Sequence, residues 1–245
     1  MKNYKNIGHR IIHLPVIDST NNYLTMLFNK GDINHGCVIM ADKQTRGRGQ
    51  RDSNWESEDG KNIMFSLCIE PQNFPVLKQF DISCFTSICI INFLNEIGIS
   101  AKIKWPNDIM VHDQKIAGIL IENQLTGKNI KLANIGIGIN INQINFNILN
   151  ATSLIKELKS KRDISKDKSL IIEHLNIGYN TFFYNHNELR KEYLEHLYQY
   201  KITAKYKSKN GFFLGEITGI SDWGKLRVKV DGQIIEFDNK EIEYI

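Results

Sequence analysis

Residues 43–55 read Lys-Gln-Thr-Arg-Gly-Arg-Gly-Gln-Arg-Asp-Ser-Asn-Trp and directly follow an apolar run, residues 37–41, that has the composition of a strand. The stretch places three arginines around two glycines: Arg46, Arg48, Arg51, Gly47 and Gly49. Glycine lets a backbone approach a ligand closely with its N–H groups turned inward, and guanidinium groups match phosphate or carboxylate oxygens. The loop therefore indicates anion binding, although basic glycine loops are also common as solvated turns. Its spacing fits neither the phosphate-binding P-loop pattern, Gly-x-x-x-x-Gly-Lys-Ser/Thr, nor the glycine pattern Gly-x-Gly-x-x-Gly.

The composition is that of a globular protein. The chain has 245 residues, 42% hydrophobic and 24% charged, enough for one sizeable core and a small second domain. Its net charge of +4 comes from 31 basic and 27 acidic residues spread along the chain, so no nucleic-acid partner is indicated and any anion specificity has to be local. No apolar stretch reaches the ~18 residues of a membrane span and Met1 to Arg10 is polar, so we expect a cytoplasmic protein without a membrane partner.

The cysteines and histidines show no metal pattern. All four cysteines lie in apolar runs without Cys-x-x-Cys spacing: Cys37, Cys68, Cys84 and Cys89. This favours reduced core residues over a metal site or disulfides. Three histidines of the C-terminal half also share no ligand-like spacing with other ligands: His174, His186 and His196.

A strand-like run, residues 9–17, leads into Asp-Ser-Thr-Asn and then into apolar residues at helical spacing. Ser19 or Thr20 is a natural N-cap for the predicted helix. The simple interpretation is a cap alone, but a helix N-terminus can also hydrogen-bond a polar ligand through its free N–H groups.

Residues 102–108, Lys-Ile-Lys-Trp-Pro-Asn-Asp, predict a strand that stops at proline, because Pro106 has no N–H for a central ladder. A hairpin follows, and its returning strand, residues 115–121, is apolar on both faces and therefore central. Lys115 lies at the head of this strand, and burying its ammonium costs free energy unless the group meets an anion. Alternatively, the Lys115 side chain is exposed at the turn and has no such partner.

Residues 135–142 alternate isoleucine with small or amide side chains. In a strand the isoleucines would share one face and the other four residues the opposite face: Gly136, Gly138, Asn140 and Asn142. Glycines inside a strand commonly mark close approach by a ligand or another backbone, with a bulge or tight helix packing as the competing explanation.

The remaining pattern predicts an α/β domain followed by a small barrel. We expect one strand and then mostly helix in the rest of the first domain: residues 62–70, 76–97 and 170–200. From about Lys201 the period changes to two, and Asp231-Gly232 is a strong hairpin turn between short strands.

Three stretches in this order resemble the biotin protein ligases (biotin-[acetyl-CoA-carboxylase] ligases): Ser19-Thr20-Asn21, residues 44–55, and Lys104-Trp105-Pro106-Asn107-Asp108 followed by residues 115–120. Gly136-x-Gly138-x-Asn140 and the C-terminal barrel match as well, so the resemblance covers nearly the whole chain. It implies an α/β (α+β) fold. A mixed-sheet catalytic domain similar to that of the lipoate ligases, residues 1–199, would be followed by an SH3-like β-barrel, residues 200–245.

The resemblance implies an ATP-dependent ligase that activates biotin as biotinoyl-5′-AMP. With Mg²⁺, the biotin carboxylate attacks the α-phosphate of ATP and releases pyrophosphate. The biotinyl group then passes to a lysine of the biotin carboxyl carrier protein of acetyl-CoA carboxylase or a related carboxylase. Two anions have to meet in the first step, so the site needs concentrated positive charge.

The resemblance also implies roles for individual residues. Arg48 and Lys115 would be catalytic and bind the biotin carboxylate and the α-phosphate. The implied biotin contacts are Ser19, Thr20, Asn21, Gln44, Gly47, Arg48, Gly49, Gln50, Trp55, Lys115, Gly118, Gly136 and Gly138. The implied ATP and adenylate contacts are Arg48, Arg51, Asn107, Asp108, Lys115 and Asn140, with Asp108 as the Mg²⁺ contact.

The basic loop departs from the family pattern at three positions, where the family often has two arginines and a glycine: Gln50, Ser53 and Asp52. The loss of two positive charges predicts compensation by Arg51 or by a basic residue of the 156–168 segment.

Only about fifteen residues precede the catalytic domain, too few for a DNA-binding domain. The resemblance therefore implies a monofunctional ligase without repressor function, as a monomer or weak homodimer.

Two alternatives stay open. A lipoate or octanoate protein ligase would share the core lysine and the general fold, but the Gly-Arg-Gly loop and the Lys-Trp-Pro-Asn-Asp stretch favour biotin. A ligand-binding module that has lost catalysis would fit the altered loop. The presence of both Arg48 and Lys115 argues against that module, because neither is needed merely to hold a ring.

Overall fold

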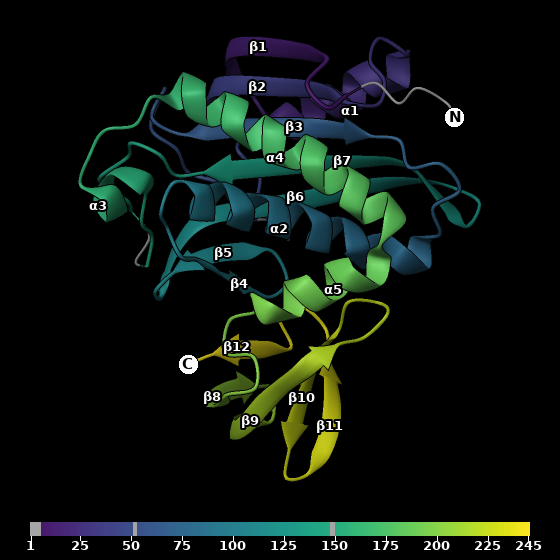
Figure 1. Cartoon of the computed structure of the whole chain (residues 1–245), viewed down its shortest axis with the longest axis vertical. Helices are drawn as coiled ribbons and strands as arrows, with labels where there is room; N and C mark the ends of the chain where they lie inside the picture. Colours follow the sequence, from purple (N-terminus) through teal and green to yellow (C-terminus); the bar gives the residue numbers. More distant parts are fainter. Residues whose placement is uncertain (1–5, 51–52, 148–149) are drawn as a thin grey trace.

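The structure is a computed structural model that describes residues 6–50, 53–147 and 150–245 and contains two β-sheets (Figure 1). The larger sheet has the strand order β1-β2-β3-β7-β6-β5-β4. Its strands are β1 (Arg10–Ile17), β2 (Cys37–Gln44), β3 (Ile63–Ile69), β4 (Lys102–Lys104), β5 (Asp108–Val111), β6 (Gln114–Thr126) and β7 (Asn129–Ile139). β1 and β2 are parallel, and all other neighbours are antiparallel. The expected mixed sheet is confirmed.

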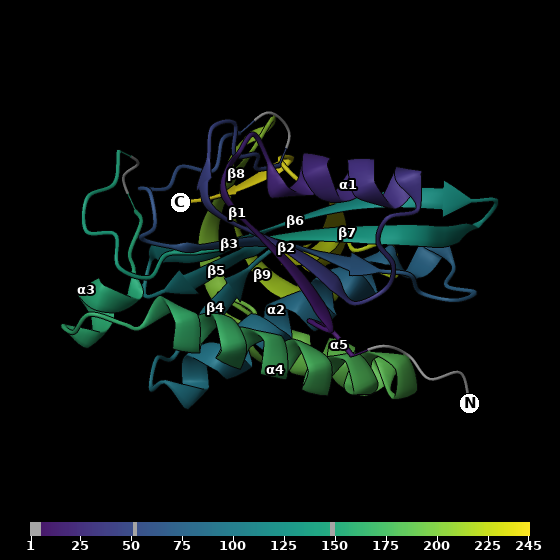
Figure 2. The ribbon, with the colours of Figure 1, turned by 90° about the horizontal axis from the view of Figure 1, so that it is seen from above.

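Helices cover both faces of this sheet (Figure 2). α1 (Thr20–Lys30) connects the parallel pair β1 and β2 and lies on one face, while α2 (Gln79–Glu96) and α4 (Ile164–Tyr184) lie on the other. The shorter helices are η1 (Val76–Lys78), α3 (Leu154–Leu158) and α5 (His186–Glu195). The core is therefore a central sheet between unequal helical layers, as hydrophobic burial on both faces requires.

The segment Val76–Glu96 is long and apolar enough to cross a membrane by length and composition alone. The expectation that no stretch would reach this length was wrong. In the fold, however, 67% of the apolar window is buried, and α2 packs beside α4 on the same face of the sheet as a core helix (Figure 2).

The cysteines are core residues, as expected. All four are free and buried in the structure. Desolvation by burial raises the pKa of the Cys84 and Cys89 thiols, so both are held in the unreactive thiol form.

The second sheet is antiparallel, with the order β11-β10-β9-β8-β12. Its strands are β8 (Thr203–Ser208), β9 (Gly211–Ile220), β10 (Leu226–Val230), β11 (Gln233–Phe237) and β12 (Ile242–Tyr244). Asp231 and Gly232 have φ of 48° and 84°, so the predicted two-residue hairpin turn between β10 and β11 is present. This sheet matches the expected SH3-like barrel. The domain boundary at residue 199 stays a prediction.

The barrel is attached to the larger sheet and its helices by polar contacts at several points. Trp105 Nε1 donates to Gly224 O at 2.8 Å. Arg190 on α5 bridges the two parts, with Nε 2.5 Å from Asp81 Oδ1 on α2 and Nη1 3.2 Å from Asp222 Oδ1 in the barrel. The Asp81 carboxylate is only 2% exposed, so this ion pair lies within the junction.

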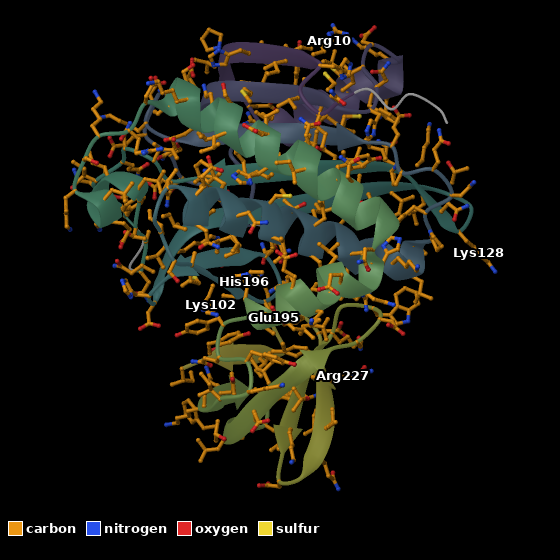
Figure 3. All side chains as sticks on the ribbon, in the orientation of Figure 1. Arg10, Lys102, Lys128, Glu195, His196 and Arg227 are labelled. Carbon is orange, nitrogen blue, oxygen red and sulfur yellow. The ribbon has the colours of Figure 1, made fainter. Side chains whose placement is uncertain are left out.

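The last residue of α5 and the segment after it also hydrogen-bond the edge strand β4 at this junction (Figure 3). Ile103 N donates to His196 O at 2.8 Å, and Lys102 Nζ donates to Glu195 O at 3.1 Å. The barrel follows directly on this segment, so its position relative to the sheet is restricted by hydrogen bonds as well as by the linking chain.

Replacing Arg190 by alanine is expected to lower the free energy of unfolding by about 3 kcal/mol, because it leaves a buried carboxylate without its guanidinium partner. Urea denaturation monitored by circular dichroism would measure the change. The matched control is Arg227→Ala, which breaks an exposed pair with Glu236 in the barrel (Figure 3) and should cost less than about 1 kcal/mol. Equal losses in the two variants would contradict a structural role for the buried pair.

Candidate active site

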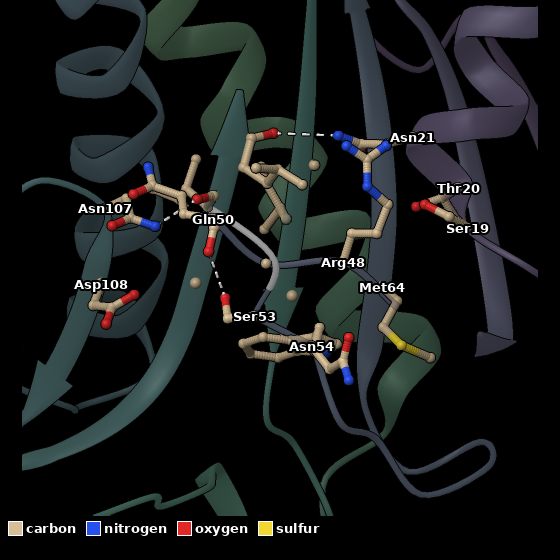
Figure 4. Close-up of a pocket in the computed structure, with 18 of the residues that line it drawn as sticks. Ser19, Thr20, Asn21, Arg48, Gln50, Ser53, Asn54, Met64, Asn107 and Asp108 are labelled. Carbon is tan, nitrogen blue, oxygen red and sulfur yellow. Dashed lines mark hydrogen bonds between the residues drawn. The ribbon is translucent and has the colours of Figure 1, made fainter. Parts of the chain in front are cut away.

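A pocket with a cavity volume of about 210 Å³ lies over the centre of the larger sheet (Figure 4). It brings together fourteen of the residues predicted from the sequence: Ser19, Thr20, Asn21, Gln44, Arg48, Gly49, Gln50, Trp55, Asn107, Asp108, Lys115, Gly118, Gly136 and Gly138. These residues come from the start of α1, the end of β2, the basic loop and strands β5, β6 and β7. The fold therefore brings the separate sequence motifs together around one cavity.

One end of the pocket is polar and is built at the start of α1. Ser19 is the N-cap residue by backbone conformation, although its side chain makes no capping hydrogen bond. A residue of β2 caps the helix N-terminus instead: Gln44 Oε1 accepts hydrogen bonds from Thr20 N at 2.8 Å and from Thr20 Oγ1 at 3.1 Å. Ser66 Oγ on β3 lies 2.8 Å from Thr20 Oγ1. This network fixes hydroxyl and amide groups at the pocket wall.

The floor of the pocket is bare backbone covered by the indole of Trp55. Gly118 on β6 and Gly138 on β7 are direct cross-strand partners. A Cβ at Gly138 would lie 2.4 Å from the Trp55 ring, and one at Gly118 would lie 2.9 Å from it. Both positions therefore exclude any larger residue while the indole stays in place.

Gly136 is explained differently, by helix packing. A Cβ there would lie 2.4 Å from Asn21 Oδ1 in the first turn of α1. The β6–β7 register is regular at the glycines and shifts only between Gln124 and Leu125, so a bulge does not account for them. The close approach of the Trp55 side chain explains Gly118 and Gly138, and the close approach of α1 explains Gly136.

The opposite end of the pocket is charged. Lys115 Nζ lies 2.7 Å from Asp108 Oδ1, and the two side chains are 29% and 30% exposed. The same ammonium lies 5.5 Å from the centre of the Trp55 ring, within the range of a cation–π contact. Of the two places that the sequence left open for Lys115, the structure shows a partly exposed side chain paired with a carboxylate of the protein, Asp108. Its contact with a substrate anion stays a prediction.

Arg48 reaches from the basic loop to the pocket rim. Its Nη1 donates to Asn22 Oδ1 at 2.6 Å, and its Nη2 pairs with Glu122. The other carboxylate oxygen of Glu122 accepts from Asn21 Nδ2 at 3.0 Å. Neither Asn22 nor Glu122 lines the pocket, so both orient the Arg48 side chain from outside the pocket.

Asn140 does not line the pocket, and the strand predicted to carry it there is shorter than expected. β7 ends at Ile139, and Asn140 N donates to Ile116 O at 2.9 Å. Its side chain is buried and donates to Thr152 O at 3.0 Å. The expectation that Asn140 and Asn142 share a strand face with the glycines was wrong, because β7 ends at Ile139 and both side chains donate to carbonyls outside the pocket, Thr152 O and Arg162 O.

Two further predicted residues are not part of the described pocket wall. Gly47 closes the basic loop, since its carbonyl accepts from Trp55 N at 3.0 Å and a Cβ on it would lie 2.5 Å from Trp55 O. Arg51 lies outside the described residues, as does Asp52. No basic residue of the 156–168 segment lines the described pocket.

Several wall residues were not predicted from the sequence: Ser53, Asn54, Met64, Phe65, Ile119, Leu120, Ile137, Asn239 and Lys240. The period of two along β6 places Leu120 on the same face as Gly118, so that signal was present for one of the missed wall residues. Nothing in the barrel sequence indicated that Asn239 and Lys240 would reach the site. Within the described parts of the chain, no group of three or more His, Cys, Asp or Glu side chains forms a metal cluster.

A methyl group at Gly138 is expected to displace the indole of Trp55, because the ring has no room to stay in place. In Gly138→Ala the hydrogen exchange of the Trp55 indole N–H, followed by ¹H–¹⁵N NMR and assigned with Trp55→Phe, should become faster. Gly219→Ala is the matched control, since a Cβ there meets nothing within 4 Å. An unchanged Trp55 signal in Gly138→Ala would show that the indole does not depend on this contact.

Comparison with known proteins agrees with this geometry. Residues 13–142 match the model of the Biotin/lipoate A/B protein ligase family. The chain is 29% identical over 244 residues to the bifunctional ligase/repressor BirA of Bacillus spizizenii, across 97% of this chain and 74% of that protein. It is 38% identical over 136 residues to the BirA of Escherichia coli, across 55% of this chain and 41% of that protein.

Solved structures show the same fold. The biotin protein ligase from Aquifex aeolicus in complex with biotin and ATP superposes with a TM-score of 0.80 at 23% identity, covering 97% of this chain and 100% of that one. The family model covers more than half of the chain, including β2, the basic loop and β5 to β7. On these grounds the chain belongs to the biotin/lipoate A/B protein ligase family.

Proposed function

We propose that this chain is an ATP-dependent biotin protein ligase, which activates biotin as biotinoyl-5′-AMP and transfers the biotinyl group to a lysine of a biotin carboxyl carrier protein. Family membership and the names of its relatives, including the biotin–[acetyl-CoA-carboxylase] ligase of Paracoccus denitrificans, support this proposal. The observation that carries it is the order of three zones in one pocket: a polar end, a glycine-floored slot and a cationic end.

This order suits an acid with a polar ring at one end and a carboxylate at the other. The ureido ring would hydrogen-bond the groups at the start of α1, where Thr20 and Gln44 are already connected. The apolar body and valeryl chain would lie along the slot beside Trp55. The carboxylate would then reach Lys115 at the charged end, which fixes its orientation before reaction.

In the first step a carboxylate oxygen forms a bond to the α-phosphorus, and the bond from that phosphorus to the bridging oxygen breaks to release pyrophosphate. Negative charge has to be neutralised on both reactants as they approach. Lys115 would donate to the oxygens at this point, with Asp108 holding its ammonium in place until the substrates arrive. Arg48 would supply a second cation from the loop.

In the second step the neutral amine of a carrier lysine attacks the acyl carbon, AMP leaves, and one proton is lost as the amide forms. The mixed anhydride is prone to hydrolysis, so the site has to exclude water between the two steps. The Trp55 indole and the basic loop cover the slot where the acyl group would lie.

We further propose that Mg²⁺ enters with the nucleotide rather than at a preformed protein site. Asp108 is the one acidic residue in the described pocket wall, and Mg²⁺ is commonly held by one or two carboxylates together with substrate phosphates. Asn107 donates through Nδ2 to Ile119 O at 2.8 Å, which leaves its amide oxygen as a second acceptor. These residues fit one Mg²⁺ carried by ATP, where it would neutralise phosphate charge.

ATP–pyrophosphate exchange with biotin, lipoate or octanoate tests the proposed activity. We expect exchange with biotin only, and a loss of roughly 100-fold or more in Lys115→Ala, because one charge-stabilising donor is removed. Lys131→Ala is the matched control, since this lysine lies on β7 of the same sheet and does not line the pocket. Exchange with lipoate or octanoate would reassign the substrate, and no exchange with any acid would indicate a binding protein.

Asp108→Asn is expected to raise the Mg²⁺ concentration needed for half-maximal exchange by roughly 10-fold, as loss of a metal-site group commonly does. The KM for biotin should change little, because Asp108 would contact the ion rather than the acid. Steady-state exchange at varied Mg²⁺ and varied biotin separates the two effects. A change in biotin KM with the same Mg²⁺ requirement would show that Asp108 only positions Lys115 and does not contact the ion.

A further inference from the structure

The guanidinium of Arg48 is held by hydrogen bonds that begin at the helix bordering the polar end of the pocket. Asn21 and Asn22 follow Thr20 in the first turn of α1. Asn22 Oδ1 accepts directly from Arg48 Nη1 at 2.6 Å. Asn21 Nδ2 donates at 3.0 Å to one oxygen of Glu122, and the other oxygen pairs with Arg48. Two consecutive helix residues therefore act on one guanidinium, one directly and one through a carboxylate.

The orientation of both asparagine amides is fixed by a partner at each end. Asn22 Nδ2 donates to Asp18 Oδ2 at 3.1 Å, which leaves its amide oxygen facing the guanidinium. Asn21 Oδ1 accepts from Ser66 Oγ at 2.5 Å, which leaves its amide nitrogen facing the carboxylate. Each amide thus presents the atom that its charged neighbour needs, an acceptor for the cation and a donor for the anion.

Asn21 also belongs to the polar end of the pocket. It lines the pocket beside Thr20 (Figure 4), and its backbone oxygen accepts from Asn134 Nδ2 of β7 at 2.8 Å. Gly136 leaves the room for this side chain, because a Cβ there would lie 2.4 Å from Asn21 Oδ1. Asn21 is therefore held between the place proposed for the ureido ring and the carboxylate of Glu122.

Stability alone does not account for Glu122. This residue lies on β6, four positions beyond Gly118 and so on the same face of the strand, but it does not line the pocket. The side chains of Arg48 and Glu122 are 43% and 34% exposed, and ion pairs with this exposure contribute little to stability. The two oxygens of Glu122 contact different elements, so the carboxylate connects α1 to the basic loop.

We propose that Glu122 is a positioning residue for the adenylation step, and that it couples the placement of Arg48 to that of Asn21. This inference rests on the proposed function. A ureido ring that hydrogen-bonds the polar end holds Asn21 with its amide nitrogen on Glu122, and the carboxylate then keeps Arg48 where the acid and the α-phosphate meet. An acid without such a ring does not make this contact. Selection for the ring is therefore expressed in the rate of activation as well as in binding.

The first test compares Glu122→Ala with Gln124→Ala in ATP–pyrophosphate exchange. Gln124 lies two positions further along the same face of β6, donates to Asn29 Oδ1 at 3.2 Å and does not line the pocket. We expect Glu122→Ala to lower kcat on the order of 10-fold, as loss of a hydrogen bond to a charged group does. The Kd for biotin, measured by calorimetry without ATP, should change less than kcat, because the ring contacts remain. Gln124→Ala should match the wild type, and an unchanged kcat in Glu122→Ala would overturn the inference.

A double-mutant cycle shows whether Glu122 acts through Arg48. If it does, Glu122→Ala should cause little further loss of kcat in an Arg48→Ala background, because the group that it positions is already absent. Equal fold losses in the two backgrounds would overturn the inference. Glu122→Gln keeps the shape of the side chain but offers one acceptor oxygen instead of two, so it should show most of the loss seen with alanine. Wild-type kinetics in Glu122→Gln would contradict the role of the carboxylate.

Failure of the proposed function would give a different result. If the wild type shows no exchange with any acid, the side-chain ¹H–¹⁵N signals of Arg48, assigned with Arg48→Lys, still report how this group is held. We expect faster rotation about its Nε–Cζ bond in Glu122→Ala than in the wild type or in Gln124→Ala, because the paired carboxylate is removed. That result would support the placement of Arg48 by Glu122 without ligase chemistry. Unchanged Arg48 signals in Glu122→Ala would overturn the inference whether or not the protein is a ligase.

Discussion

The indole of Trp55 lies against two glycines that pair across the centre of the sheet, and the site is arranged around this contact. Gly118 and Gly138 belong to different strands, so both strands have to lack a side chain at the same level for the indole to approach. Trp55 closes the basic loop and places Arg48 and Gln50 over the sheet. The loop is thereby attached to a rigid floor, which gives a substrate pocket with defined geometry.

Lys115 and Arg48 are each paired with a carboxylate of the protein, but a substrate anion can replace that carboxylate. The side chains of the Lys115–Asp108 and Arg48–Glu122 pairs are each between 29% and 43% exposed. Such half-exposed pairs contribute about 1 kcal/mol or less to stability, so an arriving carboxylate or phosphate can compete for the cation. The carboxylates orient Lys115 and Arg48 without binding them too tightly for catalysis. This balance suits a site in which two anions have to be brought together.

Much of the fold and of the site could be predicted from local signals. The barrel and the glycine face follow from periodicity, whereas the mixed sheet was expected from the resemblance to the biotin protein ligases. For Lys115 the sequence left two places open, beside an anion or exposed at the turn. Asn140 was misplaced because periodicity cannot show that β7 ends at Ile139. Lys240 was missed because its place at the site depends on how the barrel docks, through contacts such as Trp105 with Gly224 that join distant parts of the chain.

One pocket is proposed both to activate biotin and to pass it to a protein lysine. Mass spectrometry of a biotin carboxyl carrier domain incubated with this protein, ATP and biotin tests both steps together. We predict one biotinyl group on one lysine of the carrier, formed only when ATP is present and absent when Lys115→Ala replaces the wild type. An unmodified carrier, or equal transfer of lipoate, would contradict the claim.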